Sequence, residues 1–376
     1  MRRLLYLTGA IVLVDTLFFS ALTPLLPHYA RSFGLGKTGA GILAAAYPAG
    51  ALVGSIPSGI VAARLGVKPT VLAGMTVVAV TTALFGFANT GWELDLTRFC
   101  QGVASSFSWT GALAWLLAAA PAGRRGRLIG QAFAAAVGGA LLGPVLGGLA
   151  SIAGTKSTFG GVAAASLAVA VWAALTPAAR PEGRQRLATL VHAVRDPRIA
   201  LGVWLVTLPA LLFGTLGVLA PLRLAALGFG AVAIGAVWLI AGGLETVNNI
   251  LLGQLSDRFG PRAPVRAALV ASVVVLLVLP WPSERYLLAA VVVCGGLAFG
   301  AFYTPGMTML THAAEERGLD YGYTFALVNL AWAPGQTLGS VLGGAVAAST
   351  SDAVPYLALT GLVLVTLAAV RRSAAA

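Results

Sequence analysis

The sequence predicts an all-α membrane protein with twelve transmembrane helices in two pseudo-symmetric six-helix bundles. Three observations lead to this prediction. The chain of 376 residues is 58% hydrophobic and only 10% charged, whereas average soluble domains carry about 25% charged residues. Apolar windows long enough to cross a bilayer recur along the whole chain. Two stretches of the first half are repeated in the second half at nearly the same spacing. Such a chain is suited to lipid as its solvent.

Each predicted span is an apolar window of about 20 residues, the length that a helix needs to cross a hydrocarbon core of about 30 Å. Averaging hydropathy along the sequence identifies such windows. Six precede and six follow a polar stretch around residue 180, and they run roughly over Leu4–Pro27, Gly39–Ala62, Pro69–Asn89, Leu94–Ala119, Leu128–Ser151, Phe159–Thr176, Ile199–Ala220, Ala231–Leu252, Val265–Trp281, Tyr286–Thr311, Tyr323–Ala347 and Ala353–Val370.

The basic residues predict the orientation of the spans. With the N-terminus in the cytoplasm, eighteen of the 24 Lys and Arg residues fall on the cytoplasmic side, and Arg98 falls inside a span. The outer side receives only Arg31, Lys37, Lys156, Arg223 and Arg285. Because positive residues concentrate in cytoplasmic loops, we expect a multi-pass protein of the cytoplasmic (inner) membrane with both termini in the cytoplasm. The net charge of +12 then reflects contact with anionic headgroups, and no nucleic-acid partner is expected.

Two repeated stretches predict that the chain consists of two related halves. Leu142–Gly148 and Leu338–Gly344 share six of seven residues at an offset of 196. Gly59–Lys68 resembles Gly253–Arg262 at an offset of 194. Because the repeated unit holds an even number of spans, both halves have the same orientation in the membrane. We expect an N-terminal bundle at residues 1–178, a cytoplasmic linker at 179–198 and a C-terminal bundle at 199–376.

Two acidic residues fall deep inside predicted spans. Asp15 lies eleven residues into the first span, near mid-membrane at about 1.5 Å per residue. Glu245 lies similarly deep in the eighth span, and Asn248 and Asn249 follow it on the same helical face. An ionised side chain at the bilayer centre costs about 2.5–3.5 kcal/mol, so it should face a partner or an aqueous cavity. We interpret both acids as candidates for proton coupling and for binding a cationic solute; a structural pair with a polar neighbour is the alternative.

Other polar and aromatic residues inside spans extend this candidate cavity. Arg98 lies about one turn into the fourth span, and snorkelling of its long side chain to the headgroups is the simple alternative to a functional role. The remaining cavity candidates are amide and aromatic side chains: Phe19, Gln101, Trp109, Asn329 and Trp332. For Phe19 and Trp109, a lipid-facing or core position is the alternative.

The fifth span contains Gly143 followed by Pro144. Proline removes a backbone donor and disrupts one helical turn, and the surrounding glycines allow another helix to approach closely. A kinked, closely packed helix at the boundary between the halves is suited to act as a gate that resists leak. Ordinary packing of small residues is the alternative interpretation.

These patterns resemble the motifs of the major facilitator superfamily, and the resemblance covers nearly the whole chain. Arg98, Gln101 and Gly102 are similar to the Arg-x-x-Gln-Gly element of proton-coupled members, which implies a proton-coupling role for Arg98 beside Asp15. The fifth-span glycines around Pro144 are similar to the motif associated with antiporters. The resemblance therefore implies the twelve-span drug:proton antiporter branch of this family.

The loops after the second and eighth spans resemble the signature loop of the same family. The first-half loop carries Arg64 and the second-half loop carries Asp257 and Arg258, so the resemblance implies gating roles for these three residues. Where the family has an Asp in the first-half loop, this chain has Ala63. That Asp helps to lock the halves together on the cytoplasmic side, and its absence implies a weaker or different gate.

The sequence and the resemblance together predict a proton-coupled antiporter that exports small amphipathic or cationic compounds by alternating access. A narrow-specificity carrier of one metabolite, such as a sugar, a siderophore or a biosynthetic product, is the alternative. An intramembrane enzyme is disfavoured, because the sequence contains no zinc-protease, nucleophile-elbow or phosphate-loop motif. A non-transporting sensor, also disfavoured, would keep the fold but lose coupling, and a flux assay would separate it from a carrier. We expect a small-molecule substrate, protons and the lipid bilayer as partners, no cofactor or metal, and a monomer.

Overall fold

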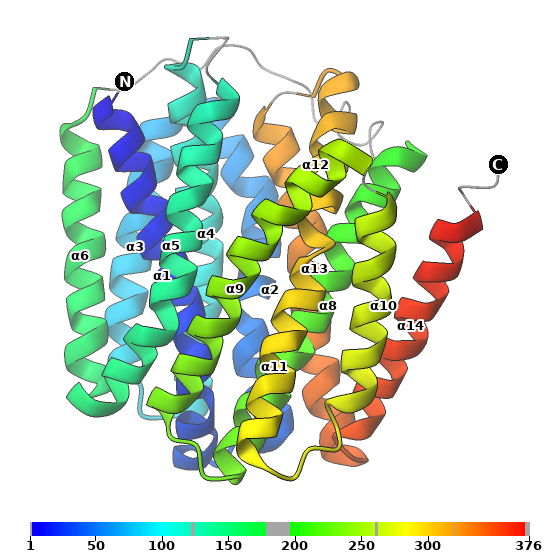
Figure 1. The fold of residues 1–376 in the computed structure, drawn as a ribbon. Coiled ribbons are helices and arrows are strands. Elements are labelled where there is room, and N and C mark those ends of the chain that lie inside the picture. Colours follow the sequence, from blue (N-terminus) through cyan, green and yellow to red (C-terminus); the bar gives the residue numbers. More distant parts are fainter. Residues whose placement is uncertain (1, 122–124, 178–195, 260–261, 320, 373–376) are drawn as a thin grey trace.

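The computed structural model is a bundle of long helices that run side by side (Figure 1). It describes residues 2–121, 125–177, 196–259, 262–319 and 321–372, and all regular structure within these ranges is helical. Both ends of the chain lie at the same end of the bundle, which we call the termini end (Figure 1). The opposite end is called the distal end.

Six helices form the first half of the described chain: α1 (Arg2–Ser32), α2 (Gly36–Leu65), α3 (Val67–Phe87), α4 (Gly91–Ala118), α5 (Arg125–Ala153) and α6 (Thr155–Leu175). The second half contains α8 (Pro197–Ala226), α9 (Ala231–Phe259), α10 (Arg262–Val278), α11 (Arg285–Gly300), α12 (Tyr303–Glu316), α13 (Tyr321–Ser349) and α14 (Ala353–Arg372). The 21 residues of α3 span about 31 Å at about 1.5 Å per residue, enough to cross a hydrocarbon core.

The tenth pass consists of two helices, α11 and α12, where the sequence predicts one span over Tyr286–Thr311. The chain leaves regular helix at Ala301 and Phe302. Pro305 has no backbone N–H with which to continue the hydrogen-bond ladder, and helical bonding resumes when the N–H of Gly306 donates to the Phe302 carbonyl at 3.2 Å. With α11 and α12 counted as one pass, the described helices make twelve passes, so the predicted fold class is confirmed.

Nine helical segments within the described ranges are long and apolar enough to cross a membrane by length and composition alone. The remaining passes are the 17-residue α10 and the helices α4 and α13. Both of these carry polar residues well inside the helix: Arg98 and Gln101 in α4, and Asn329 and Gln336 in α13. Their lower hydropathy is therefore a consequence of facing the interior of the bundle.

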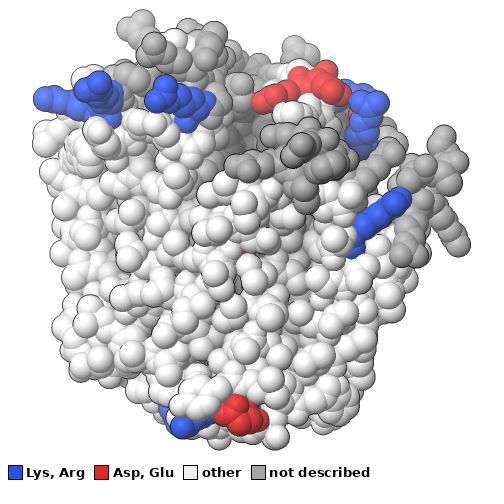
Figure 2. All heavy atoms as spheres, in the orientation of Figure 1, with Lys and Arg blue, Asp and Glu red and all other residues white. Residues whose placement is uncertain are grey.

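The surface of the bundle is that of a multi-pass membrane protein. Figure 2 shows charged residues gathered mainly at the two ends, with a broad, nearly uncharged band between them. Large apolar side chains such as Val53, Val80 and Ile250 are exposed. A continuous apolar surface of this extent would be unfavourable in water and is favourable against lipid tails.

Helix ends follow the local sequence. At the start of α4, the backbone N–H of Thr90 donates to the Glu93 carboxylate at 3.2 Å, which forms a capping box. Gly66 ends α2 with φ of 100°, a conformation that residues with a Cβ rarely adopt. At the start of α8, Asp196 accepts a hydrogen bond from the first turn and Pro197 occupies the first helical position, where its missing N–H costs nothing.

The repeated sequence packs in the same way in both halves. A Cβ on Gly143 of α5 would lie 2.6 Å from the carbonyl oxygen of Leu17 in α1. Gly339 of α13, 196 residues later, faces the carbonyl of Leu211 in α8 just as closely. These glycines let α5 lie against α1 and α13 lie against α8. The same glycine-mediated helix contact therefore occurs in both halves, as expected for a duplicated six-helix unit.

The two halves meet along two helix pairs, α2 with α13 and α5 with α9. Gly41 of α2 faces the Ser340 carbonyl of α13, and Gly235 of α9 faces the Pro144 carbonyl of α5. The two contacts are equivalent by the same repeat, since the offsets are 194 and 196. All four positions lie in the distal half of their helices, so the halves are closed against each other at the distal end.

The predicted linker at 179–198 lies mostly outside the described residues, which stop at Pro177 and resume at Asp196. The predicted bundle boundaries, 1–178 and 199–376, therefore stay predictions. The first residue of α8, Pro197, falls within the predicted linker.

Candidate functional site

The centre of the first half holds a buried carboxylate with three hydrogen-bond donors. Asp15 of α1 is 3% exposed. Its Oδ2 accepts hydrogen bonds from the Tyr47 hydroxyl at 2.8 Å, the Ser105 hydroxyl at 2.7 Å and the Trp109 indole N–H at 2.7 Å. These donors come from α2 and α4. Because burial of a charge is costly unless it is hydrogen-bonded, these three hydrogen bonds offset part of the cost of holding an ionised Asp15 away from water.

Arg98 of α4 is buried next to this cluster. The side chain is 1% exposed, so it does not snorkel to the headgroups. Its guanidinium donates to the α1 carbonyls of Phe18 at 3.4 Å and Phe19 at 3.1 Å. It also lies 5.0 Å from the ring centroids of Phe18 and Tyr47, within the range of cation–π attraction. Arg98 thus joins α4 to α1 through backbone and aromatic contacts.

Tyr47 connects Arg98 to Asp15. Its ring lies against the guanidinium and its hydroxyl bonds the carboxylate. No direct ion pair between Arg98 and Asp15 occurs among the described side chains. The sequence reasoning missed Tyr47, and the available signal was a hydroxyl-bearing residue beside a proline in an otherwise apolar span.

A small cavity lies between the halves beside Arg98. Its volume is about 40 Å³, and its walls include Phe19 of α1, Ala44 of α2, Arg98 of α4, Gly214 of α8, and Gln336 and Ser340 of α13. The Nε atom of Arg98 is shielded from solvent and makes no hydrogen bond within the described part of the chain. Sites for drug-sized ligands have volumes of about 300–1,000 Å³, so this space is suited to water and the substrate route is closed at this level.

Aromatic rings join the halves in the middle of the bundle. Phe19 of α1 packs edge-on against Trp332 of α13, with ring centroids 5.5 Å apart. Phe19 also contacts the Tyr47 ring at 4.9 Å. The predicted cavity residues Phe19 and Trp332 therefore continue the chain of contacts that begins at Asp15. Gln101 is fully buried and accepts a long hydrogen bond of 3.5 Å from Arg98, and Asn329 is partly buried.

Glu245, the partly buried acid of the second half, packs against a helix of that same half. The Glu245 carboxylate of α9 packs on Gly300 of α11, where it would overlap an added Cβ. Asn248, one turn further along α9, donates to the Leu297 carbonyl of α11 at 3.5 Å. The Oδ1 atom of Asn249 is shielded and has no partner among the described residues. Asp15 is thus hydrogen-bonded by α2 and α4, whereas the Glu245 carboxylate packs on α11.

The predicted gating residues occupy different places. Gly143 packs α5 against α1 within the first half, while the carbonyl of the adjacent Pro144 faces α9 across the interface. Arg64 is exposed at the termini end of α2. The side chains of Asp257 and Arg258 lie outside the described residues.

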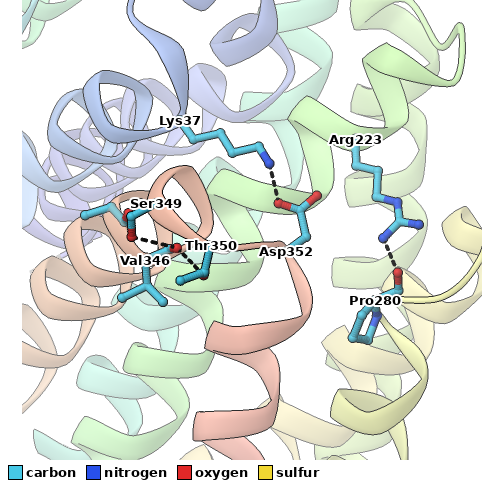
Figure 3. A network of polar contacts seen from close by, with 8 residues as sticks. Lys37, Arg223, Pro280, Val346, Ser349, Thr350 and Asp352 are labelled. Atoms are coloured by element: carbon cyan, nitrogen blue, oxygen red, sulfur yellow. Dashed lines mark hydrogen bonds and ion pairs between the residues drawn. The ribbon is translucent and has the colours of Figure 1, made fainter.

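An ion pair reinforces the closed distal end. Lys37 in the first turn of α2 donates to Asp352, just before α14, at 2.6 Å (Figure 3). The pair joins the two halves, because α2 belongs to the first and α14 to the second. In the same view Arg223 of α8 donates to the Pro280 carbonyl, which ties the end of α8 to the loop after α10 within the second half (Figure 3).

Replacing Lys37 with Ala is expected to loosen this distal contact. The side chains of the pair are 39% and 24% exposed, so its loss costs at most about 1 kcal/mol, a change of about fivefold in the closed-to-open ratio. The readout is the labelling rate of an Ala347→Cys variant, free of native cysteines, by a membrane-impermeant maleimide added from the distal side. Arg285→Ala, whose ring contacts stay within the second half, is the control. An unchanged rate in Lys37→Ala would contradict the assignment.

Among the described residues, no group of three or more His, Cys, Asp or Glu side chains is placed to hold a metal ion. The polar centre of the described bundle consists of the hydrogen-bonded Asp15 cluster in the first half, the partly buried Glu245 in the second half, and an aromatic contact between the two halves.

The architecture and this buried polar centre define a twelve-pass membrane carrier built from two similar halves. The family model of the Major Facilitator Superfamily matches residues 8–336 and 247–374. The chain belongs to this superfamily and is a transporter, which confirms the family resemblance of its motifs. Family and relatives indicate transport of small molecules instead of enzymatic catalysis.

Several named proteins are similar to this chain over most of their length. Multidrug resistance protein MdtG of Citrobacter koseri is 26% identical over 383 residues, which cover 96% of this chain and 90% of that protein. MdtG of Dickeya zeae is 27% identical over 326 residues, covering 82% and 77%. A D-xylose-proton symporter has a TM-score of 0.77 at 13% identity, covering 98% and 96%. The nucleoside transporter NupG has a TM-score of 0.76 at 14% identity, covering 98% and 99%. The two solved structures show the shared fold.

Proposed function

We propose that this chain is a proton-coupled antiporter that exports small amphipathic or cationic compounds by alternating access. The observation that carries the proposal is the Asp15 carboxylate, which is 3% exposed and accepts three hydrogen bonds at one oxygen. Such a carboxylate can hold a proton or attract a cationic solute, and occupation by one opposes occupation by the other. That competition is the minimal requirement for exchange.

Protonation of Asp15 has a direct structural consequence in this mechanism. A proton on Oδ2 would remove an acceptor site, so Tyr47, Ser105 and Trp109 would have to change their hydrogen bonds. Tyr47 belongs to α2, which packs along α13 of the other half. Protonation is thereby coupled to the α2–α13 contact that closes the distal end, and rocking of the halves alternates the side from which Asp15 is reached.

Arg98 and Glu245 have supporting roles in this proposal. Arg98 holds α4 against α1 and keeps a positive charge near Asp15, which favours release of the proton to the cytoplasm before the next solute binds. Glu245 offers a second carboxylate in the other half. Because its carboxylate packs on Gly300 of α11 within the second half, we assign it to an independent protonation step and not to a shared pair with Asp15.

The names of similar proteins support export of diverse compounds. The relatives at 26–27% identity are called multidrug resistance proteins, and antiport with protons is the coupling that a membrane carboxylate supplies without a nucleotide-binding domain. The orientation proposed here, with the termini end in the cytoplasm, makes the distal end the outer side. The described state is then closed to the outside.

A narrow-specificity carrier is the second candidate. It is favoured by the donors around Asp15, since Tyr47, Ser105 and Trp109 offer hydrogen bonds that suit a polar metabolite. The solved structures with the same fold include a sugar symporter and a nucleoside transporter.

The test compares a lipophilic cation with polar solutes under an imposed pH gradient. Proteoliposomes with an acidic interior receive either tetraphenylphosphonium or a polar solute, D-xylose or uridine, from outside. The proposal predicts accumulation of the cation that is lost when an ionophore collapses the pH gradient, and no accumulation of the polar solutes. Accumulation of a polar solute without the cation, either under this gradient or with the gradient reversed as a symporter requires, would replace the proposal with the second candidate.

A further inference from the structure

A groove outside the central site opens on the apolar band of the protein between α2, α4 and α13. Its volume is about 360 Å³, within the range of small-molecule sites. Its walls are small and apolar residues of α2 between positions 42 and 49, Asp95 and Phe99 of α4, and Thr337 and Val341 of α13. Ile42 and Leu96 on its rim are 44% and 51% exposed, so the groove faces lipid.

Asp95 supplies the one carboxylate among the residues that line the groove, and none of those residues is basic. Its Oδ1 atom is shielded from solvent and has no hydrogen-bond partner in the described part of the chain, and the same holds for the Thr337 hydroxyl. Asp95 takes part in none of the ion pairs between described residues. A shielded, unpaired carboxylate oxygen is costly, and a ligand with a positive charge would remove that cost.

The depth of Asp95 suits a ligand that enters from the membrane. Asp95 is the fifth residue of α4 counted from the distal end, about 6 Å along the helix axis. With a hydrocarbon core of about 30 Å centred on the 28 residues of α4, which are about 42 Å long, this level is the boundary between headgroups and acyl chains. An amphipathic cation placed there has its charge near the interface and its apolar body in the hydrocarbon.

We propose that this groove binds a lipophilic monocation from the distal leaflet, with its charge against Asp95 and its apolar body along Phe99 and the α2 alanines. A zwitterionic lipid fits less well, because its phosphate would meet no basic side chain in the groove. The inference goes beyond the proposed function, since it concerns a second site outside the central cavity. It holds for any direction of transport.

The groove and the central cavity lie back to back on the same three helices. Ala44, Arg98 and Gln336 line the central cavity, and the next residue of each helix, Ala45, Phe99 and Thr337, lines the groove. Because α2 and α13 belong to different halves, the groove exists in this form only while these helices are packed together. A bound cation therefore stabilises the state that is closed at the distal end.

The experiment measures ligand protection of a cysteine in the groove. Cys100 and Cys294 are replaced by Ala, Ile42→Cys is introduced, and its labelling rate by a membrane-permeant maleimide is followed in proteoliposomes of neutral lipid. Tetraphenylphosphonium is the probe, because its charge does not depend on pH. At four times its dissociation constant it is expected to slow labelling about fivefold, since the free fraction is 1/(1 + [L]/Kd).

Variants and a neutral analogue assign the protection to Asp95. Asp95→Asn is expected to raise the probe's dissociation constant about tenfold or more, through loss of a charge pair shielded from water, and Asp95→Glu is expected to restore it. Triphenylphosphine oxide, a neutral analogue, should not protect. Val80→Cys on the lipid-facing surface of α3 controls for bulk effects of the probe on the membrane and should label at an unchanged rate.

Three results would overturn the inference: no protection at Ile42→Cys, equal protection in Asp95→Asn, or equal protection by the neutral analogue. Transport of the same probe, measured on the same variants, reports separately on the proposed function. Transport of the probe without protection at Ile42→Cys would overturn cation binding in the groove and leave the proposed function standing. Protection without transport would support the groove and count against the proposed function.

Discussion

Asp15→Asn is expected to lower pH-driven transport at least about a hundredfold, a loss of about 2.7 kcal/mol in the coupled step. Asn retains a side-chain carbonyl that can accept the hydrogen bonds of Tyr47, Ser105 and Trp109, so the bundle should fold normally. It cannot take up or release a proton in the transport cycle. The measurement is uptake of tetraphenylphosphonium into proteoliposomes with an acidic interior.

Two controls separate coupling from folding in this variant. Asp15→Glu keeps the titratable group and is expected to retain a measurable part of the activity. Exchange of labelled for unlabelled solute without a pH gradient needs no net proton movement, so in Asp15→Asn it should fall less than pH-driven uptake, and only by as much as the lost charge weakens binding of the cation. Wild-type rates of pH-driven uptake in Asp15→Asn would remove Asp15 from the coupling mechanism.

Gly102→Ala is expected to destabilise the protein more than any other single methyl addition near the site. A Cβ at this position of α4 would overlap the carbonyl of Tyr47 in α2 and lie 2.8 Å from the backbone nitrogen of Ala51. Moving α4 away from α2 costs about 1–3 kcal/mol, against a gain of about 1 kcal/mol for replacing a mid-helix Gly with Ala, so the net loss of stability is up to about 2 kcal/mol. We expect the unfolding temperature to fall by up to about 2–3 °C, at about 2.1 cal/mol/K of unfolding entropy per residue.

The matched control is Gly160→Ala in α6, where no atom lies within 4 Å of the added Cβ. Its unfolding temperature should stay the same or rise, because only the helix propensity changes. Thermal unfolding of both purified variants in one detergent provides the comparison. Equal stability of the two variants would show that the α2–α4 contact adjusts at no cost. Gly102→Ala should also displace Tyr47 from Asp15 and lower pH-driven transport.

The fold class could be predicted from the sequence because a lipid bilayer permits few backbone structures. A spanning segment must satisfy its backbone hydrogen bonds internally, so each apolar window is a helix. The repeat of Gly143 and Gly339 was informative for the same reason, since close helix contacts in membranes require small residues. The break between α11 and α12 was missed, because Pro305 lies inside an otherwise continuous apolar window.

The candidate site was only partly accessible from the sequence. Depth in a span singled out Asp15 and Glu245, but their neighbours depend on how each helix is rotated, which one sequence does not specify. Tyr47 was therefore missed as a partner of Asp15. Trp109, expected as a wall of the cavity, is placed as a hydrogen-bond donor.

Asp95 was missed for a different reason. It lies at the edge of a predicted span, where an acidic residue is easily interpreted as interfacial. Its shielded oxygen and the groove around it become visible only when α2, α4 and α13 are placed together.

The most direct test of the central claim is solute-driven proton movement without an imposed gradient. Proteoliposomes that contain a pH-sensitive dye are prepared with equal internal and external pH, and tetraphenylphosphonium is added outside. Exchange at Asp15 predicts that entry of the cation moves protons outward, so that the interior becomes more alkaline in the wild type and does not change in Asp15→Asn. Uptake of the cation with no pH change in the wild type would contradict proton antiport.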